Sequence, residues 1–452
     1  MIDTILLIMI AAVLGTGLGV LTGLIPGLHV NNVAIILLSL SPLMATGLMS
    51  FAGLGEYTVL LMVSSAIVAT SMAHTFLDFI PSTFLGAPEP ETALSVLPAH
   101  GMLMEGNGFR AVFLSAIGSF GAVIVGCLLL IPYRLMVNEP INGYSILKEY
   151  MVWVLIGVVI LMLVTETSEI PYVFKKRADG EIQREKGRFS RTLGIILALF
   201  LFLLSGILGL AALDLEVTSP FGLPATVLFP LLSGLFGTST LIESLRGGAE
   251  VPEQKTDQDQ VDVAEAAGSV TTGGIAGSVV GFLPGMSGGV ATIIAMLFRK
   301  DPSPSSVILT LSAINTANSF FVLSALFLIL RPRSGAAIVV NELIDASEWT
   351  AISPPVDLTL LMIAALIAST LGFFLTIFLG RRLANLLPKV PYHLLVKGII
   401  IFIVVMVFAF TGFLGIICLI VATSVGMIAP IIGIRRSHAM GVLLLPVIMM
   451  IW

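Results

Sequence analysis

A Pro-Gly pair that occurs twice inside long apolar stretches constrains this chain most. The first copy is GLIPGLHVNN at residues 23–32, and the second is GFLPGMSGGV at residues 281–290. Proline removes a backbone donor and blocks helix continuation, while glycine permits backbone angles that other residues avoid. Because lipid cannot satisfy the freed backbone groups, broken helices at membrane depth line a protein-enclosed cavity or water path. Two breaks at corresponding positions in the two halves of a chain point to a transporter's binding site.

The composition is that of a membrane protein. Of the 452 residues, 57% are hydrophobic and only 11% are charged, whereas soluble proteins carry about 25% charged residues. Apolar runs of about 18 residues or more recur along the chain, and each is a candidate membrane helix. We predict an all-α polytopic protein of the cell (plasma) membrane, in contact with lipid, without a separate soluble domain. The first residues lack a basic region, so they are expected to form a mature membrane segment rather than a signal peptide.

The two halves of the chain show the same order of predicted elements. Each begins with a helical hairpin broken at Pro-Gly (3–49 and 268–299), followed by about five further membrane segments and one irregular segment (78–108 and 331–355). This order predicts an ancient duplication, with repeats at 1–245 and 268–452. The polar, acidic stretch 246–267 between them is expected to be a flexible cytoplasmic linker. The predicted spans are 57–77, 109–132, 150–169, 191–212, 222–245, 305–330, 356–379, 392–410, 412–429 and 434–451.

Basic residues set the predicted orientation. The loop 171–191 holds seven lysines and arginines and is therefore assigned to the cytoplasm. Counting spans from this loop places the start of the first repeat outside and the start of the second inside, which makes the repeats inverted. Arg331 and Arg333 are the exception, because the count leaves them on the external side.

The two breaks are the first candidate site. A new half-helix is expected to begin near Val30 or Asn31 and another near Gly288 or Gly289. A helix amino terminus offers unpaired N–H groups and a partial positive charge, so two converging termini suit an anion. The alternative is a pair of proline kinks packed by small residues. The substrate-binding candidates at the breaks are Pro26, Gly27, His29, Asn31, Asn32, Pro284, Gly285, Ser287, Gly288, Gly289 and Thr292.

A second candidate group follows in NTANSFF and RPRSG. Asn315 and Asn318 lie three apart, on one helix face. Their carbonyl groups suit a cation, and their amides suit a carboxylate. Arg331, Arg333 and Ser334 are candidates for holding a substrate carboxylate, the arginines through charge-assisted bonds. The alternative is that the asparagines join helices and the arginines extend to the membrane interface.

Ionisable residues in the first half give a third candidate. His74 and Asp78 lie four apart and share a face if the segment is helical. An ionisable pair near the membrane is a functional hypothesis, here a proton relay or a ligand for the coupling ion. The alternative is an interfacial pair at a helix end. Glu166 and Glu169, near a cytoplasmic helix end, are expected at the surface.

Three stretches carry a family resemblance. They are GTGLGVLTGLIPGLHVNN, GGIAGSVVGFLPGMSGGVAT and ETALSVLPAHGMLMEGNGFRAVFLSAIGSFGA. With them the chain resembles the large membrane subunit of the tripartite tricarboxylate transporter family, and NTANSFFVLSALFLILRPRSG resembles a divergent archaeal branch of it. The resemblance implies ion-coupled carboxylate uptake, with a small membrane subunit and an extracytoplasmic binding protein as partners. Only Pro26, Gly27, Pro284 and Gly285 carry over from the family pattern.

The leading functional hypothesis is a secondary transporter for a small organic anion, working by alternating access of the two halves. No cofactor is expected apart from a coupling ion, Na⁺ or H⁺, and no nucleic acid partner; a homo-oligomer is left open. The alternatives are a passive anion channel, a non-transporting scaffold and an intramembrane enzyme. For the enzyme, the sequence offers no nucleophile elbow, no His-Glu-x-x-His motif and no cysteine ligand cluster.

Overall fold

The computed structural model describes most of the chain, and statements below about absent features concern the described residues alone. Not described are residues 1, 27, 29, 87–91, 93, 95, 167–172, 177–181, 186–189, 223–226, 247–251, 258–260, 284–287, 289–290, 293–294, 296–302, 390–391 and 452.

The described chain is helical, apart from one antiparallel hairpin of two short strands in the basic loop. Eight of its helices are long and apolar enough to cross a membrane, which confirms the predicted all-α polytopic class. In chain order the elements are α1 (Ile2–Leu24), α2 (Val30–Ala52), α3 (Glu56–Leu77), α4 (Phe79–Phe84), α5 (Val96–Met104), α6 (Gly108–Val137), α7 (Gly143–Val164), β1 (Val173–Lys176), β2 (Ile182–Glu185), α8 (Ser190–Ala212), α9 (Leu228–Leu232), the π-helix η2 (Ser233–Thr238), α10 (Ser239–Arg246), α11 (Val263–Phe282), α13 (Pro304–Ile329), α14 (Gly335–Ile344), α15 (Val356–Leu386), the 3₁₀ helix η3 (Leu387–Lys389), α16 (Tyr392–Gly426), α17 (Ile428–Ile432), the 3₁₀ helix η4 (Arg436–Met440) and α18 (Gly441–Ile451).

The first helix break lies where the Pro-Gly pair predicts it. α1 ends at Leu24, Pro26 is buried in the turn, and α2 begins at Val30. At the second break α11 ends at Phe282 and the chain is helical again at Gly288. Pro284, Gly285 and Ser287 lie outside the described residues. Glycine also interrupts α16, because Gly412 has a φ of 64°, and this separates the two spans predicted there.

Three segments differ from the sequence prediction. The segment 78–108 contains α4 and α5, and 331–355 contains α14, although both were expected to be irregular. The stretch 246–267 was expected to be a flexible linker, but one of its residues, Gln254, is bonded to α5 and α6. The Gln254 side chain accepts a hydrogen bond from the Gly108 amide at 2.8 Å and donates one to the Leu103 carbonyl at 3.0 Å. These bonds satisfy backbone groups at the start of α6 and the end of α5, which explains why Gln254 binds between these two helix ends.

The chain forms two compact units that do not follow the predicted repeat boundary. Unit 1 comprises residues 1–148, 249–295 and 301–399, and unit 2 comprises 149–248, 296–300 and 400–452. α7 and α16 run from one unit into the other. Each unit draws on both halves of the sequence, whereas the repeats and their inversion across the membrane stay predictions.

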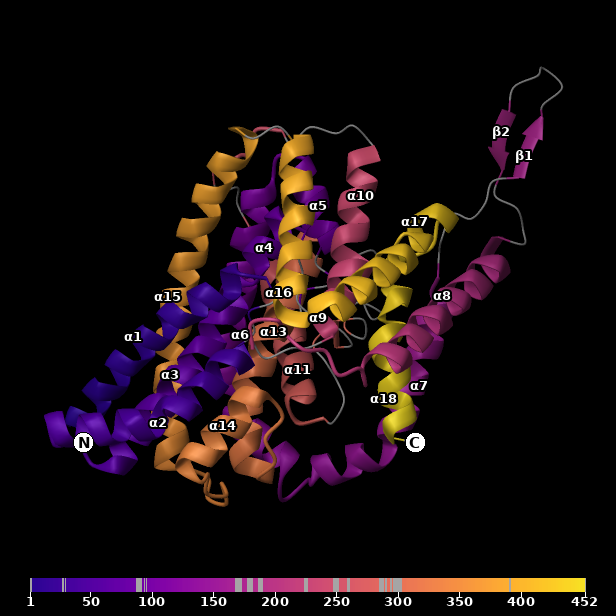
Figure 1. Cartoon of the computed structure of the whole chain (residues 1–452). Helices are drawn as coiled ribbons and strands as arrows, with labels where there is room; N and C mark the ends of the chain where they lie inside the picture. Colours follow the sequence, from indigo (N-terminus) through magenta and orange to yellow (C-terminus); the bar gives the residue numbers. More distant parts are fainter. Residues whose placement is uncertain are drawn as a thin grey trace. The chain divides into compact units, whose positions relative to one another are not determined.

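Inside unit 1 each half packs one long helix against the helix pair of the other half. α1 packs along α3, and α11 packs along α13 (Figure 1). α6, from the first half, lies against α11 and α13, while α15, from the second half, lies against α1 and α3. Each half therefore contributes one long helix to the packing of the other half's pair.

The two helix pairs pack with the same atomic contacts. A Cβ added at Gly19 on α1 would lie 2.6 Å from Ala73 Cβ, and one added at Gly277 on α11 would lie 2.6 Å from Ala317 Cβ. In both cases the added atom would also lie 2.7 Å from the carbonyl oxygen three residues earlier on the partner helix. Only glycine permits such an approach. The same packing geometry therefore occurs in both halves, and the duplication stays a prediction.

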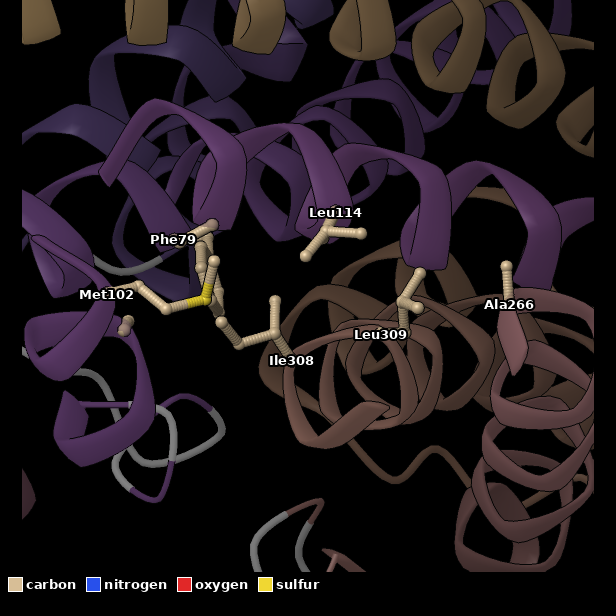
Figure 2. Packing of buried hydrophobic residues seen from close by; sticks show 8 residues of the cluster. Phe79, Met102, Leu114, Ala266, Ile308 and Leu309 are labelled. Atoms are coloured by element: carbon tan, nitrogen blue, oxygen red, sulfur yellow. The ribbon is translucent and has the colours of Figure 1, made fainter. Parts of the chain in front are cut away.

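The start of α4 is fixed by an apolar cluster in unit 1. Phe79, directly after Asp78, is buried together with residues of α5, α6, α11 and α13. Figure 2 shows Phe79 beside Met102, and the cluster also includes Leu114, Ile308, Leu309 and Ala266. This packing holds the junction between α3 and α4, where Asp78 lies.

Unit 2 is held by close packing of α8 against η4 and α18. A Cβ added at Gly441 would lie 2.2 Å from the Phe202 carbonyl oxygen. Glu166, expected at the surface, is only 2% exposed and bonds to His438. The prediction for Glu166 was wrong because His438, far away in sequence, covers and binds its carboxylate.

Candidate functional site

A polar cavity of about 90 Å³ lies in unit 1, at the starts of α2 and α14 and beside α3 and α13. A cavity of this size accepts several water-sized groups. Its lining brings together six predicted site residues: Asn31, His74, Asp78, Asn315, Asn318 and Ser334. The lining also includes three hydroxyl residues that sequence reasoning missed: Ser71, Thr75 and Ser319. We call this cavity the pocket.

Asp78 places a buried carboxylate at a helix junction. α3 ends at Leu77, and the Asp78 amide donates to the His74 carbonyl at 2.9 Å before α4 begins at Phe79. The side chain is only 3% exposed. Asn315, on α13, donates from its Nδ2 to Asp78 Oδ2 at 2.9 Å. A carboxylate from the first half and an amide from the second half therefore meet directly in the pocket wall.

His74 lies one turn before Asp78 and faces the end of α1. Its Nδ1 is 3.1 Å from the hydroxyl oxygen of Thr22, shortly before the first break. Thr75, the next residue, shares a hydrogen bond of 3.0 Å with Thr316 on α13. These two bonds connect α3 to α1 and to α13 at the level of the pocket.

Asn31 connects the first break to α14. Its Oδ1 accepts a hydrogen bond from the Ala336 amide at 3.1 Å, while Ser334 accepts one from Ala337 and caps the same helix. A Cβ added at Gly335 would lie 2.6 Å from Asn31 Cγ, so glycine is needed there. The Asn31 oxygen thus already serves as a helix cap, and Asn31 also lines the pocket.

The two predicted arginines lie outside the pocket lining. α13 ends at Leu330 in the left-handed conformation, with a φ of 46°. Beyond it, the Arg333 guanidinium lies over the ring of Tyr144, 5.3 Å from the centroid. Burial lowers the pKa of Arg333 from its ordinary value. Arg331 is exposed. Contact of these arginines with a substrate therefore stays a prediction.

The remaining candidates lie at the two breaks. Thr292 and Gly288 are buried, and the Thr292 hydroxyl donates to the Gly288 carbonyl at 2.9 Å, so this hydroxyl is used within its own helix. Outside the described residues lie Gly27, His29, Pro284, Gly285, Ser287 and Gly289, and the side chain of Asn32 is not described either.

Matching contacts show which pocket residues correspond in the two halves. A Cβ at Gly19 would lie 3.2 Å from the His74 amide nitrogen, and one at Gly277 would lie 3.0 Å from the Asn318 amide nitrogen. His74 and Asn318 therefore occupy equivalent positions. The same offset pairs Ser71 with Asn315, Thr75 with Ser319 and Asp78 with Val322, and all of these residues line the pocket.

The pocket is thus built from the same positions of two similar helices, but its chemistry is unequal. The first half supplies an imidazole and a carboxylate, and the second half supplies two carboxamides and a valine. Its described ionisable groups, His74 and Asp78, come from α3 and from the junction directly after it. The buried carboxylate is able to bind a cation or a proton, and the amides and hydroxyls beside it are able to donate hydrogen bonds to an anion.

Comparison with known proteins identifies the family of the chain. Residues 9–441 match the model of the Tripartite tricarboxylate transporter TctA family. The chain belongs to this family. The family is one of transporters, not of enzymes, and the chain is a multi-pass membrane protein of this family.

One relative is similar over almost the full length. The uncharacterized protein MJ1079 of Methanocaldococcus jannaschii is 26% identical over 442 residues, which cover 97% of each chain. This likeness agrees with the expected divergent archaeal branch of the TctA family. No solved structure matches the chain.

Proposed function

We propose that this TctA-family protein is the permease subunit of an ion-coupled secondary transporter for organic anions, specifically di- or tricarboxylates. The pocket would hold the coupling ion and one end of the substrate. The observation that carries this proposal is the pocket itself, which equivalent positions of two halves line beside the start of a broken helix. A passive channel or a scaffold gives no reason for a buried carboxylate at that point.

The anion side of the proposal rests on hydrogen-bond donors. α2 begins at Val30, which lines the pocket, so the unpaired amides of its first turn and its partial positive charge lie beside the cavity. Asn318 and Ser319 add neutral donors from α13. Uncharged donors of this kind bind a carboxylate without requiring a permanently buried cation.

The cation side rests on Asp78. A buried carboxylate is costly in an apolar surrounding unless a positive charge or a proton accompanies it. Asn315 already donates one hydrogen bond to it, and Ser71 and Thr75 line the same cavity with hydroxyl oxygens. Carboxylate and hydroxyl oxygens are suitable ligands for Na⁺, and protonation of Asp78 gives the alternative of H⁺ coupling. We assign the coupling ion to this group of oxygens.

The packing of α6 and α15 against the helix pair of the opposite half suggests how the pocket would open alternately to the two sides of the membrane. The α1–α3 pair is packed against α15 and the α11–α13 pair against α6, with the pocket between α3 and α13. Rocking of one pair relative to the other would open the pocket first to one side of the membrane and then to the other. By analogy with tripartite systems, a small membrane subunit and an extracytoplasmic binding protein are proposed partners.

Uptake into liposomes tests this function. Purified protein is reconstituted and supplied with labelled di- and tricarboxylates, with an inward gradient of Na⁺, of H⁺, or of neither. Accumulation above the external concentration only in the presence of one ion gradient is the expected result. Equilibration that ignores both gradients would support the channel alternative, and no movement of any carboxylate would contradict the proposal. Thermal stabilisation by one carboxylate and one ion together would identify both ligands.

A further inference from the structure

A second cluster of buried ionisable groups lies in unit 2. Glu166 follows the end of α7, and His438 lies in η4, 272 positions later in the chain. They are 2% and 0% exposed, and His438 Nε2 bonds to Glu166 Oε2. The proposed transport mechanism does not use either residue.

The surroundings hold this pair in place. The Arg435 amide donates to Glu166 Oε2 at 3.5 Å, and the Ser205 hydroxyl, on α8, donates to the His438 carbonyl at 3.4 Å. The next charged residue, Arg436, bonds to Thr240 and to Glu243 of α10. Arg436 and Glu243 therefore form an ion pair with each other. The bonds from the Arg435 amide and from the Ser205 hydroxyl hold Glu166 and His438 next to each other.

The bond to Glu166 determines which ring nitrogen is basic. A carboxylate accepts hydrogen bonds, so Nε2 carries the hydrogen and Nδ1 keeps the lone pair. Nδ1 is buried, and within the described part of the chain it has no hydrogen-bond partner. A buried imidazole that is oriented by a carboxylate and keeps its second nitrogen available is the arrangement that proteins use to accept a proton.

We propose that Glu166 and His438 form a proton-binding site in unit 2. Nδ1 of His438 takes one proton from water, and the resulting imidazolium keeps its Nε2–H on the Glu166 carboxylate. The hydrogen bond, which until then has a charge only on its acceptor, then joins two opposite charges and becomes stronger. Proton binding thus strengthens the attachment of η4 and α18 to the end of α7, and this attachment weakens as the pH rises. The site does not depend on the transport function proposed above.

Thermal unfolding of the purified full-length protein at a series of pH values tests this site. Histidine changes its charge between about pH 5 and pH 8, so that range is covered. Wild type is expected to melt about 3 °C higher than His438→Gln at the acidic end, with the difference shrinking toward the alkaline end. A difference that stays constant or grows with pH would overturn the proposal.

A second variant keeps the proposal testable if the His438→Gln protein does not fold. Glu166→Gln keeps an acceptor oxygen for Nε2–H but removes the negative charge that favours the imidazolium. We expect this variant to lose the pH-dependent part of the wild-type melting curve. If Glu166→Gln keeps the full wild-type dependence, or if wild type itself shows none, Glu166 and His438 do not bind a proton together.

Discussion

At the scale of single residues, Asp78 sets the chemistry of the pocket. It is a buried carboxylate at the junction of α3 and α4, bonded to Asn315 from the other half of the chain. Its equivalent in that half is Val322, which cannot ionise. At these equivalent positions the first half therefore carries the charge and the second half carries neutral amides.

Replacement of Asp78 by Asn tests this division of roles. The shape of the side chain is kept, but the negative charge to which we assign the coupling ion is lost. We expect a loss of at least about 1.4 kcal/mol in ion-binding free energy, or about tenfold in affinity. The ion dependence of carboxylate uptake measures it. Asp345→Asn, at an exposed helix end where Asn also adopts a positive φ, is the control. Unchanged ion dependence in Asp78→Asn would remove Asp78 from the ion site.

Sequence reasoning found the ionisable and amide residues of the pocket but missed its hydroxyls. His74, Asp78, Asn315 and Asn318 stand out because such side chains are rare in apolar helices. Ser71 and its neighbours do not stand out, because serine and threonine in membrane helices bond back to their own helix and are common. Aligning the glycines of α1 with those of α11 would have revealed them.

At the scale of helices, glycine contacts determine the packing of the two pairs. The Pro-Gly breaks were predictable because proline and glycine act on the local backbone. The exchange of α6 and α15 between halves was not predictable, because a helix's own sequence does not record which distant helix it contacts. Gly19 and Gly277 bring α1 onto α3 and α11 onto α13 in the same way.

Alanine at these glycines should weaken both pairs. In Gly19→Ala and Gly277→Ala the added methyl group meets partner atoms 2.6 Å away, and such overpacking costs about 1–3 kcal/mol. Unfolding of each purified variant gives the change in stability. Gly17→Ala is the matched control on α1, because a Cβ there meets nothing within 4 Å, and alanine favours a helix. Equal stability of all three variants would show that the close approach is unimportant.

At the scale of the whole molecule, the sequence predicts two repeats, whereas compact packing divides the chain differently. Both units contain segments of both halves, so a boundary drawn at residue 245 does not separate two independently packed bodies. Composition was sufficient to predict the membrane class, because apolar runs of spanning length need no tertiary information. The predicted orientation of the two repeats is inferred from the distribution of basic residues alone.

Cysteine labelling tests the predicted inversion. Asn138 and Asn385, at equivalent ends of paired spans, are replaced singly by Cys in a chain without Cys127 and Cys418. A membrane-impermeant thiol reagent applied to intact cells is expected to label one position and not the other, because inverted repeats face opposite sides. Labelling of both positions from the same side would refute the inverted arrangement.

The most direct test of the central claim is an experimental structure of the wild-type protein in lipid, determined with citrate or succinate and with the coupling ion present. We predict helices interrupted at both Pro-Gly pairs, with the carboxylate beside the start of α2 and the ion at Asp78 and Asn315. Continuous helices through both prolines, or a carboxylate bound away from the pocket, would contradict the account.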